Sequence, residues 1–154
     1  MRIAPLFALL LSMLAAPAFA QGGAVSLNSA MFVERAVKQP NGSTKLVLEQ
    51  PKSVPPGAKL VFQLSYRNGG AATATNFVIN NPVPAPVAFE SAEGGALVSV
   101  DGGKTFGPLA AARVRTADGK TRPARADEVT HIRWTLASIP PGGAGRVSFR
   151  GSVR

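Results

Sequence analysis

The sequence predicts an all-β sandwich, and three features of the chain support this fold class. After the first twenty positions, short apolar runs alternate with turn residues, and the chain contains 16 glycines and 13 prolines. Short strands separated at regular intervals by turn signals are typical of an all-β sandwich or barrel. No long stretch repeats its apolar positions with the period of a helix, so a helical fold is not expected.

Alternation of apolar and polar residues, which places successive side chains on opposite faces of a strand, is clearest at residues 59–67 and 129–136. The first segment places four apolar side chains on one face, namely Leu60, Phe62, Leu64 and Tyr66. The second places Ile132, Trp134 and Leu136 together, and Trp134 is expected to fill the gap between two sheets. Other strands are predicted at residues 31–37, 44–49, 75–80, 87–91, 96–100 and 146–154.

Turn residues separate these strands. Pro40-Asn41-Gly42 predicts a hairpin turn, and Asp118-Gly119 predicts a hairpin tip within a basic, loop-like segment at residues 110–127. Asn68-Gly69-Gly70 is expected to form a tight turn that uses left-handed backbone angles.

The N-terminus has the pattern of a secretory signal peptide. Arg2 precedes an apolar run at residues 6–16, and Ala18-Phe19-Ala20 is a small-x-small cleavage site. The apolar run is shorter than the roughly 20 residues needed to span a bilayer. We therefore expect a signal peptide at residues 1–20, cleavage between Ala20 and Gln21, and export to the periplasm or the medium. A flexible lead at residues 21–30 and a single domain at residues 31–154 follow.

Composition narrows the possible partners. The chain has no cysteine, so it forms no disulfide. It has 17 Lys and Arg residues against 8 Asp and Glu, which gives a net charge of +9, or +8 once Arg2 leaves with the signal peptide. A basic exported protein is drawn to anionic lipid head groups or acidic polysaccharide, although the charge also serves solubility. Nucleic acid is not expected as a partner, because of the compartment and the small number of aromatic residues available for base stacking.

Three segments resemble the DUF11-type conserved repeat domain. Pro55-Pro56-Gly57, the alternating strand after it and Asn68-Gly69-Gly70 resemble the opening of that domain, and residues 72–80 followed by Pro82 resemble its next strand. Residues 134–143, from the tryptophan to the Pro-Pro-Gly-Gly turn, resemble its closing motif. The similarity covers residues 54–153 and departs from the family at residues 81–84, where an Asp-containing step is replaced.

This resemblance implies an immunoglobulin-like Greek-key β-sandwich of the kind used in bacterial envelope and surface proteins, a family without an assigned biochemical activity. Members often occur as tandem repeats, whereas this chain has one copy, so a tandem-stalk role is not implied.

The sequence shows no arrangement of residues typical of catalysis. His131 is the only histidine, it is predicted to face outward, and no G-x-S-x-G motif supplies a nucleophile for it, although Asp127 and Glu128 are close in sequence. Glu90 and Glu93 could belong to a glycosidase pair, but nothing favours this. We therefore expect no enzyme activity, no cofactor and no metal site.

The one pattern that suggests a binding surface is basic. Arg146, Arg150 and Arg154 fall on one face of the last predicted strand, and His131 and Arg133 fall on the outward face of the preceding one. If these strands are neighbours in one sheet, as immunoglobulin-like topology would place them, they form a cationic strip, to which residues 113–125 add a basic loop. The hypothesis is that this strip meets an anionic envelope component, the alternative being a solvated polar face.

These observations predict a non-catalytic envelope module that acts through contacts with an envelope protein or an anionic polymer or lipid. An exposed edge strand could accept a partner strand, and the final strand is the less protected one, because prolines interrupt residues 82–86. The alternative is a small carbohydrate- or ligand-binding sandwich, for which Phe106 is the candidate exposed aromatic residue.

Overall fold

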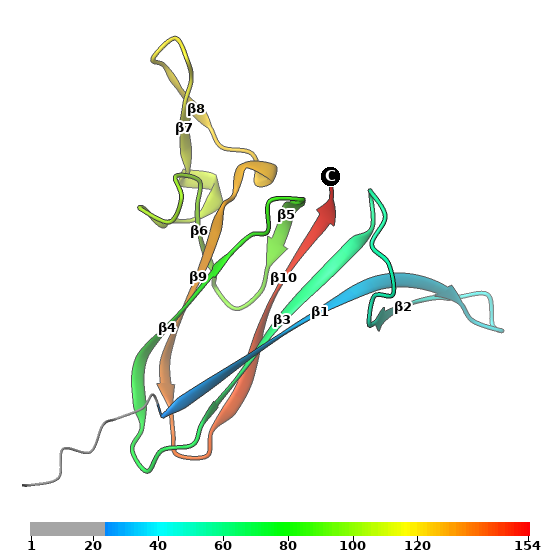
Figure 1. Cartoon of the computed structure of the whole chain (residues 1–154), viewed down its shortest axis with the longest axis vertical. Coiled ribbons are helices and arrows are strands. Elements are labelled where there is room, and N and C mark those ends of the chain that lie inside the picture. The colour runs from blue at the N-terminus through cyan, green and yellow to red at the C-terminus, as the bar shows by residue number, and fades with distance from the viewer. Residues whose placement is uncertain (1–23) are drawn as a thin grey trace, which may run out of the picture.

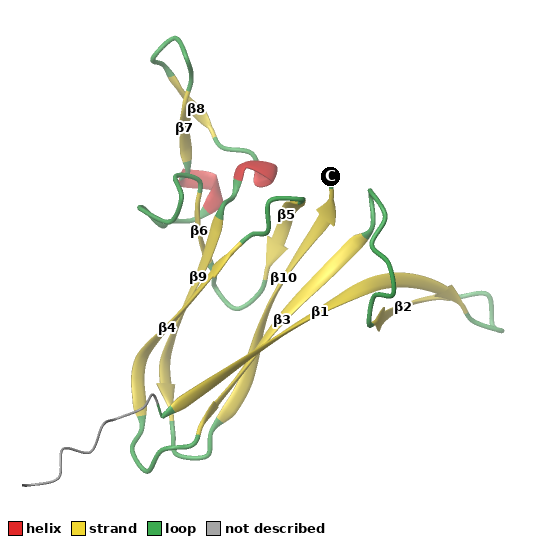
Figure 2. Ribbon diagram, viewed as in Figure 1, coloured by secondary structure: helices red, strands yellow, loops and turns green. Residues whose placement is uncertain are grey.

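The computed structural model describes residues 24–154, so the predicted signal peptide lies outside the described residues. These residues form two antiparallel sheets and a separate hairpin (Figures 1 and 2), which confirms the predicted all-β sandwich. The larger sheet has the order β2 (Thr44–Glu49), β1 (Val25–Lys38), β3 (Lys59–Asn68), β10 (Ala144–Val153) and β5 (Val87–Ala92). The smaller sheet has the order β4 (Ala74–Pro82), β9 (His131–Ile139) and β6 (Leu97–Ser99).

Between β6 and β9 the chain leaves the sandwich. It forms two short 3-10 turns, η1 (Leu109–Ala111) and η2 (Ala126–Glu128), and between them the hairpin of β7 (Arg113–Arg115) and β8 (Thr121–Pro123), which projects from one end of the molecule (Figure 1). The predicted hairpin tip at Asp118-Gly119 is confirmed, since it joins these two strands. Among residues 24–154, no helix has the length and apolar character needed to cross a membrane.

The strand order differs from the expected one at the end of the chain. The sequence predicts β9 and β10 as neighbours, as in an immunoglobulin domain, where the last two strands pair. Instead β10 lies between β3 and β5 in the larger sheet, and β9 lies in the centre of the smaller sheet. The final strand is therefore not an exposed edge, and the prediction that it could accept a partner strand is wrong.

The first strand is twice as long as the sequence predicts. β1 begins at Val25, within the predicted flexible lead, and its first half pairs with β3 from Val25 opposite Asn68 to Val33 opposite Leu60. Beyond Val33, β1 pairs only with β2, so this part of the hairpin is a two-stranded ribbon that leaves the sandwich (Figure 1).

The core lies between the two sheets, as the alternation predicts. Trp134 of β9 is buried against Phe149 of β10 with ring centroids 6.5 Å apart, and Phe149 stacks on Phe62 of β3 at 4.5 Å. The Trp134 indole donates a hydrogen bond of 2.7 Å to the Glu93 carbonyl, so its one polar atom is satisfied. The predicted position of Trp134 between the sheets is confirmed.

Asn68, at the end of β3, is fully buried and holds together the loops that cross between the sheets. Its side-chain amide donates two hydrogen bonds of 2.8 Å, to the carbonyl of Ala72 before β4 and to the carbonyl of Ile139 at the end of β9. Its side-chain oxygen accepts a hydrogen bond of 3.0 Å from the Gly70 amide. One side chain thus satisfies backbone groups from both crossing loops, and its bond to the Ile139 carbonyl is buried while the other two are part-buried.

The Asn68 backbone completes the connection to the last strand. Its N–H donates to the Gly143 carbonyl, and its carbonyl accepts from the Gly142 N–H, both at 2.8 Å. These two bonds fix the register of β3 against β10 at the end of the sandwich where the chain turns from β9 into β10.

The reason for glycine beside Asn68 differs from the prediction. The left-handed backbone angles found among the described glycines do not include Gly69 and Gly70. Gly70 is required by space instead, because a Cβ there would lie 2.6 Å from the Cβ of Ala24 and 3.2 Å from the Asn68 side-chain oxygen. The start of β1 therefore packs on the loop that Asn68 organises.

We expect Asn68→Ala to lower the free energy of unfolding by about 3 kcal/mol or more, because it leaves buried carbonyl and N–H groups without partners. Asn68→Asp should also destabilise, since it places an oxygen against two carbonyl oxygens. The exposed Asn28 is the matched control, and Asn28→Ala should change stability by less than about 0.5 kcal/mol. Chemical denaturation measures all three, and an Asn68→Ala protein as stable as the control would contradict this role.

Candidate anionic-partner surface

The structure does not assemble the predicted cationic strip. His131 and Arg133 lie on β9 in the smaller sheet, whereas Arg146 and Arg150 lie on β10 in the larger sheet. Because each pair points away from the core between the sheets, the two pairs lie on opposite outer faces of the sandwich. The strip hypothesis is wrong in this form, since it required β9 and β10 to be adjacent.

Arg150 is neutralised on the outer face of the larger sheet. Its guanidinium forms an ion pair with Glu34 of β1 across the intervening strand β3, over Val61. On the same face Lys59 forms an ion pair with Glu90. The contact with Lys59 is the main cause of a lowered Glu90 pKa. This end of the face therefore carries paired charges rather than a cationic patch.

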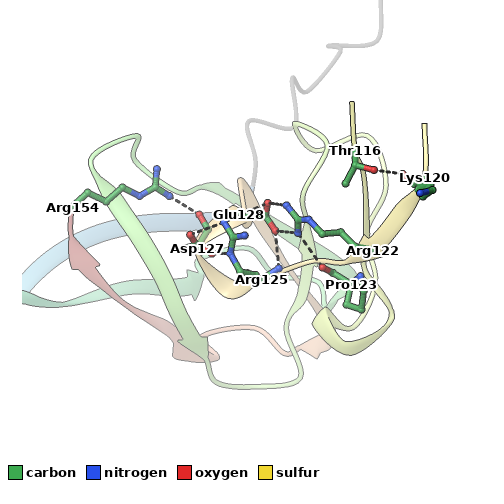
Figure 3. Close-up of polar contacts among 8 residues, drawn as sticks. All are labelled: Thr116, Lys120, Arg122, Pro123, Arg125, Asp127, Glu128 and Arg154. Atoms are coloured by element: carbon green, nitrogen blue, oxygen red, sulfur yellow. Dashed lines mark hydrogen bonds and ion pairs between the residues drawn. The ribbon is translucent and has the colours of Figure 1, made fainter. Parts of the chain in front are cut away.

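Arg154 has a structural role at the C-terminus. Its guanidinium donates a hydrogen bond of 2.6 Å to the backbone carbonyl of Asp127 in η2 (Figure 3) and one of 3.4 Å to the carbonyl of Ala85. It thereby ties the end of the chain to the base of the projecting hairpin.

The basic loop is largely neutralised at its base as well. Arg122 of β8 forms a two-pronged ion pair with Glu128, at 2.7 and 2.5 Å, and Arg125 pairs with Asp127 at 3.0 Å (Figure 3). Arg113 and Arg115 alternate with Val114 on β7, and they point to the opposite face of the hairpin from Arg122, which is the partner of Val114.

On the smaller sheet, Arg133 is held by two neighbours. Its guanidinium lies over the Phe106 ring, 3.7 Å from the centroid, and its Nε donates a hydrogen bond of 2.8 Å to Asn80. Phe106, the aromatic residue considered for carbohydrate stacking, is therefore covered on one face. His131 packs beside Gly103, and its Nδ1 lies 3.2 Å from the Thr130 hydroxyl. Its ring therefore packs against the loop that follows β6.

Arg146 is the one residue of the predicted strip that lies beside a second unpaired arginine. Arg146 is opposite Ser65, and Arg67 is two residues further along β3, so both arginines project from the same outer face on adjacent strands. Neither forms an ion pair with a carboxylate of residues 24–154. They border a shallow hollow that is also lined by Ser26, Leu27, Asn28, Ser65, Tyr66, Ala144 and Gly145.

The polar residues of this hollow come from three adjacent strands. Asn28 of β1, Ser65 of β3 and Arg146 of β10 form one row across the sheet, and Ser26, Arg67 and Ala144 form the next row. Hydroxyl, amide and guanidinium donors together suit an anionic oxygen, and arginine binds phosphate or carboxylate with two parallel hydrogen bonds. We call these residues the arginine hollow.

Alternation along the last strand predicts the outward position of Arg146, but nothing in the sequence places Arg67 near it. The alternation of residues 59–67 correctly places Arg67 on the outer face. What the sequence could not supply was the neighbour of β3, because Arg67 joins Arg146 only through the pairing of β3 with β10.

The carboxylates of the described residues are not clustered for metal binding. Within residues 24–154, no group of three or more histidine, cysteine, aspartate or glutamate side chains is placed to hold a metal ion. The carboxylate of Asp101 is used in its own loop, where it accepts hydrogen bonds from the Ser99 and Thr105 hydroxyls, both at 2.6 Å. These bonds hold its pKa far below the ordinary value.

Comparison with known proteins gives no relative. No family model, no curated protein and no solved structure matches the chain.

The base of the hairpin should respond to acid through Glu128. The Arg122 guanidinium is the main cause of a Glu128 pKa of about 2, followed by the hydrogen bond from the Arg125 amide. Because the folded-state pKa is below the ordinary glutamate value of 4.5, this pair stabilises the hairpin base above about pH 4.5 and is lost as the pH falls toward 2. A carboxyl NMR titration should give a midpoint near 2, and Arg122→Gln should raise it. A midpoint near 4.5 in the unsubstituted protein would contradict the pairing.

Proposed function

We propose that this chain is an exported, non-catalytic envelope module that binds anionic groups of lipid or acidic polysaccharide through the arginine hollow. The proposal includes the DUF11-like relationship and the cleaved signal peptide that the sequence suggests. The observation that carries it is that Arg67 and Arg146 project from one outer face on adjacent strands, and neither forms an ion pair with a carboxylate of residues 24–154.

The distribution of charge supports this choice of surface. All eight acidic side chains of residues 24–154 are engaged. Five of them are held by cations or hydroxyls of other elements, and Asp101, Asp118 and Asp127 by residues of their own loop or turn. The excess positive charge is therefore carried by side chains such as Arg67 and Arg146, which have no acidic partner there. A surface of this kind attracts anions, and the attraction weakens as salt is added.

Binding to vesicles tests the proposal. We expect the protein to sediment with vesicles of phosphatidylglycerol and not with vesicles of phosphatidylcholine, and a soluble polyuronate to compete if polysaccharide shares the site. Arg67→Gln/Arg146→Gln should weaken vesicle binding about 30-fold, since each basic residue near an anionic membrane contributes about 1 kcal/mol.

The matched control removes the same charge elsewhere. Arg113→Gln/Arg115→Gln alters two exposed arginines of the projecting hairpin and should retain most of the binding. Equal losses in the two double variants would show attraction by net charge alone. Unchanged binding by Arg67→Gln/Arg146→Gln would show that the arginine hollow is not the site.

A further inference from the structure

The two-stranded ribbon formed by the end of β1 and by β2 has an edge with no hydrogen-bonded neighbour among the described residues. Beyond Val33, no strand other than β2 pairs with β1, and β2 has no partner on its other edge. Both leucines of β2 are exposed, Leu46 by 58 % and Leu48 by 42 %. A two-stranded ribbon is marginally stable in water, and an exposed apolar edge is a template for pairing with another strand.

We propose that two copies of this chain associate through β2, whose strands pair antiparallel about a two-fold axis at Val47 to join the two larger sheets into one. This inference concerns the opposite end of the larger sheet from the arginine hollow and does not depend on the proposed function.

The hairpin turn determines which backbone groups of β2 face the partner. The Gln39 N–H donates to the Ser43 carbonyl at 2.8 Å, and the Gly42 N–H donates to the Gln39 carbonyl at 2.9 Å, with Gly42 in the left-handed region at φ 80°. This is a type I turn followed by a bulge at glycine. Because hydrogen-bonded pairs alternate along an antiparallel ladder, the backbone groups of Lys45, Val47 and Glu49 face β1, and those of Thr44, Leu46 and Leu48 face outward.

The outward groups restrict the possible registers. Even-numbered residues must face even-numbered residues of the partner, so the two-fold axis lies at a residue rather than between two residues. With the axis at Val47, Leu46 of one copy exchanges hydrogen bonds with Leu48 of the other, and the two Val47 residues face each other. Pro51 does not interfere, because its odd-numbered position points its nitrogen away from the partner.

Side-chain chemistry selects Val47 among these registers. With the axis there, Lys45 lies opposite Glu49 of the second copy on one face, and Leu46 lies opposite Leu48 on the other, so charge and apolar surface are complementary at once. An axis at Leu46 would place Lys45 opposite Val47, and an axis at Leu48 would place Lys45 opposite Pro51. Opposite-charge and apolar cross-strand pairs stabilise a sheet, whereas like charges destabilise it.

Three other sheet edges are protected against such pairing. The other edge of the larger sheet, β5, packs against η2. In the smaller sheet, β4 is interrupted by the left-handed backbone of Asn76, with φ 50°, and ends at Pro82, while β6 has only three residues. Edges are commonly blunted in these ways. Among residues 24–154, two edge segments of the larger sheet lack such protection, namely β2 and the first half of β1, which pairs with β3 alone. Only β2 combines a free edge with the charge pattern that makes it complementary to a second copy of itself.

Charge exchange tests the register. In sedimentation velocity, the protein purified after expression with its own leader should be a dimer at micromolar concentration. Lys45→Glu and Glu49→Lys should each weaken dimerisation roughly tenfold or more, because each places two like-charge pairs across the axis. The double variant Lys45→Glu/Glu49→Lys should restore it, and so should an equimolar mixture of the two single variants.

Lys104→Glu is the matched control, since it changes an exposed lysine away from β2 by the same charge and should leave dimerisation unchanged. A monomeric unsubstituted protein would overturn the proposal. So would single variants that dimerise normally, a control that weakens dimerisation equally, or a mixture that stays monomeric.

A cysteine cross-link tests the axis independently, and the absence of native cysteine makes it selective. Opposed residues of a non-hydrogen-bonded antiparallel pair have Cα atoms about 4.5 Å apart, which lies within disulfide range. Val47→Cys should therefore form a disulfide-linked dimer under mild oxidation. Lys45→Cys should not, because position 45 of one copy faces Glu49 of the other copy rather than the second position 45. Equal cross-linking of both variants, or none at Val47→Cys, would overturn the proposed axis.

Discussion

Asn68 joins the two sheets of this protein at one end of the sandwich, and the position of the arginine hollow depends on it. Without disulfides, the loops that cross between the sheets must be held by packing and hydrogen bonds alone. Asn68 supplies three side-chain hydrogen bonds to those loops and two backbone bonds to the turn before β10. Burial makes this arrangement demanding, because each buried polar group left unpaired costs about 1–3 kcal/mol.

The same residue positions the arginine hollow. Arg67 directly precedes Asn68, and the bond from Asn68 to Gly143 fixes the register in which Arg146 stands beside Ser65.

At the other end of the larger sheet, β1 continues beyond its pairing with β3, and β2 forms the free edge there. Pairing of two β2 strands about an axis perpendicular to the sheet would keep the outer faces of both copies on the same side. The two arginine hollows of such a dimer would then face one anionic surface together, and binding by two linked sites is tighter than binding by one.

The sequence predicts the local structure well and the neighbours of each strand poorly. Alternation identifies the buried face of β3 and the position of Trp134, because side-chain direction in a strand follows from the period of two. It does not say which strand lies alongside, so His131 and Arg133 were grouped with Arg146 although they lie in the other sheet. The small residues of positions 21–30 predict a flexible lead, yet Val25 to Ala30 form the start of β1 because β3 pairs with them.

Hydrogen exchange at Asn68 tests most directly whether this residue holds the two sheets together. The amides to follow by NMR are those of Asn68 and Gly142, with Phe149 as the core reference and Gly119 in the hairpin tip as the exposed reference. We expect Asn68 and Gly142 to exchange only through global unfolding, with the same opening free energy as Phe149. Exchange of the Gly142 amide as fast as that of Gly119 would show that the loops open independently of the core, and would contradict this account.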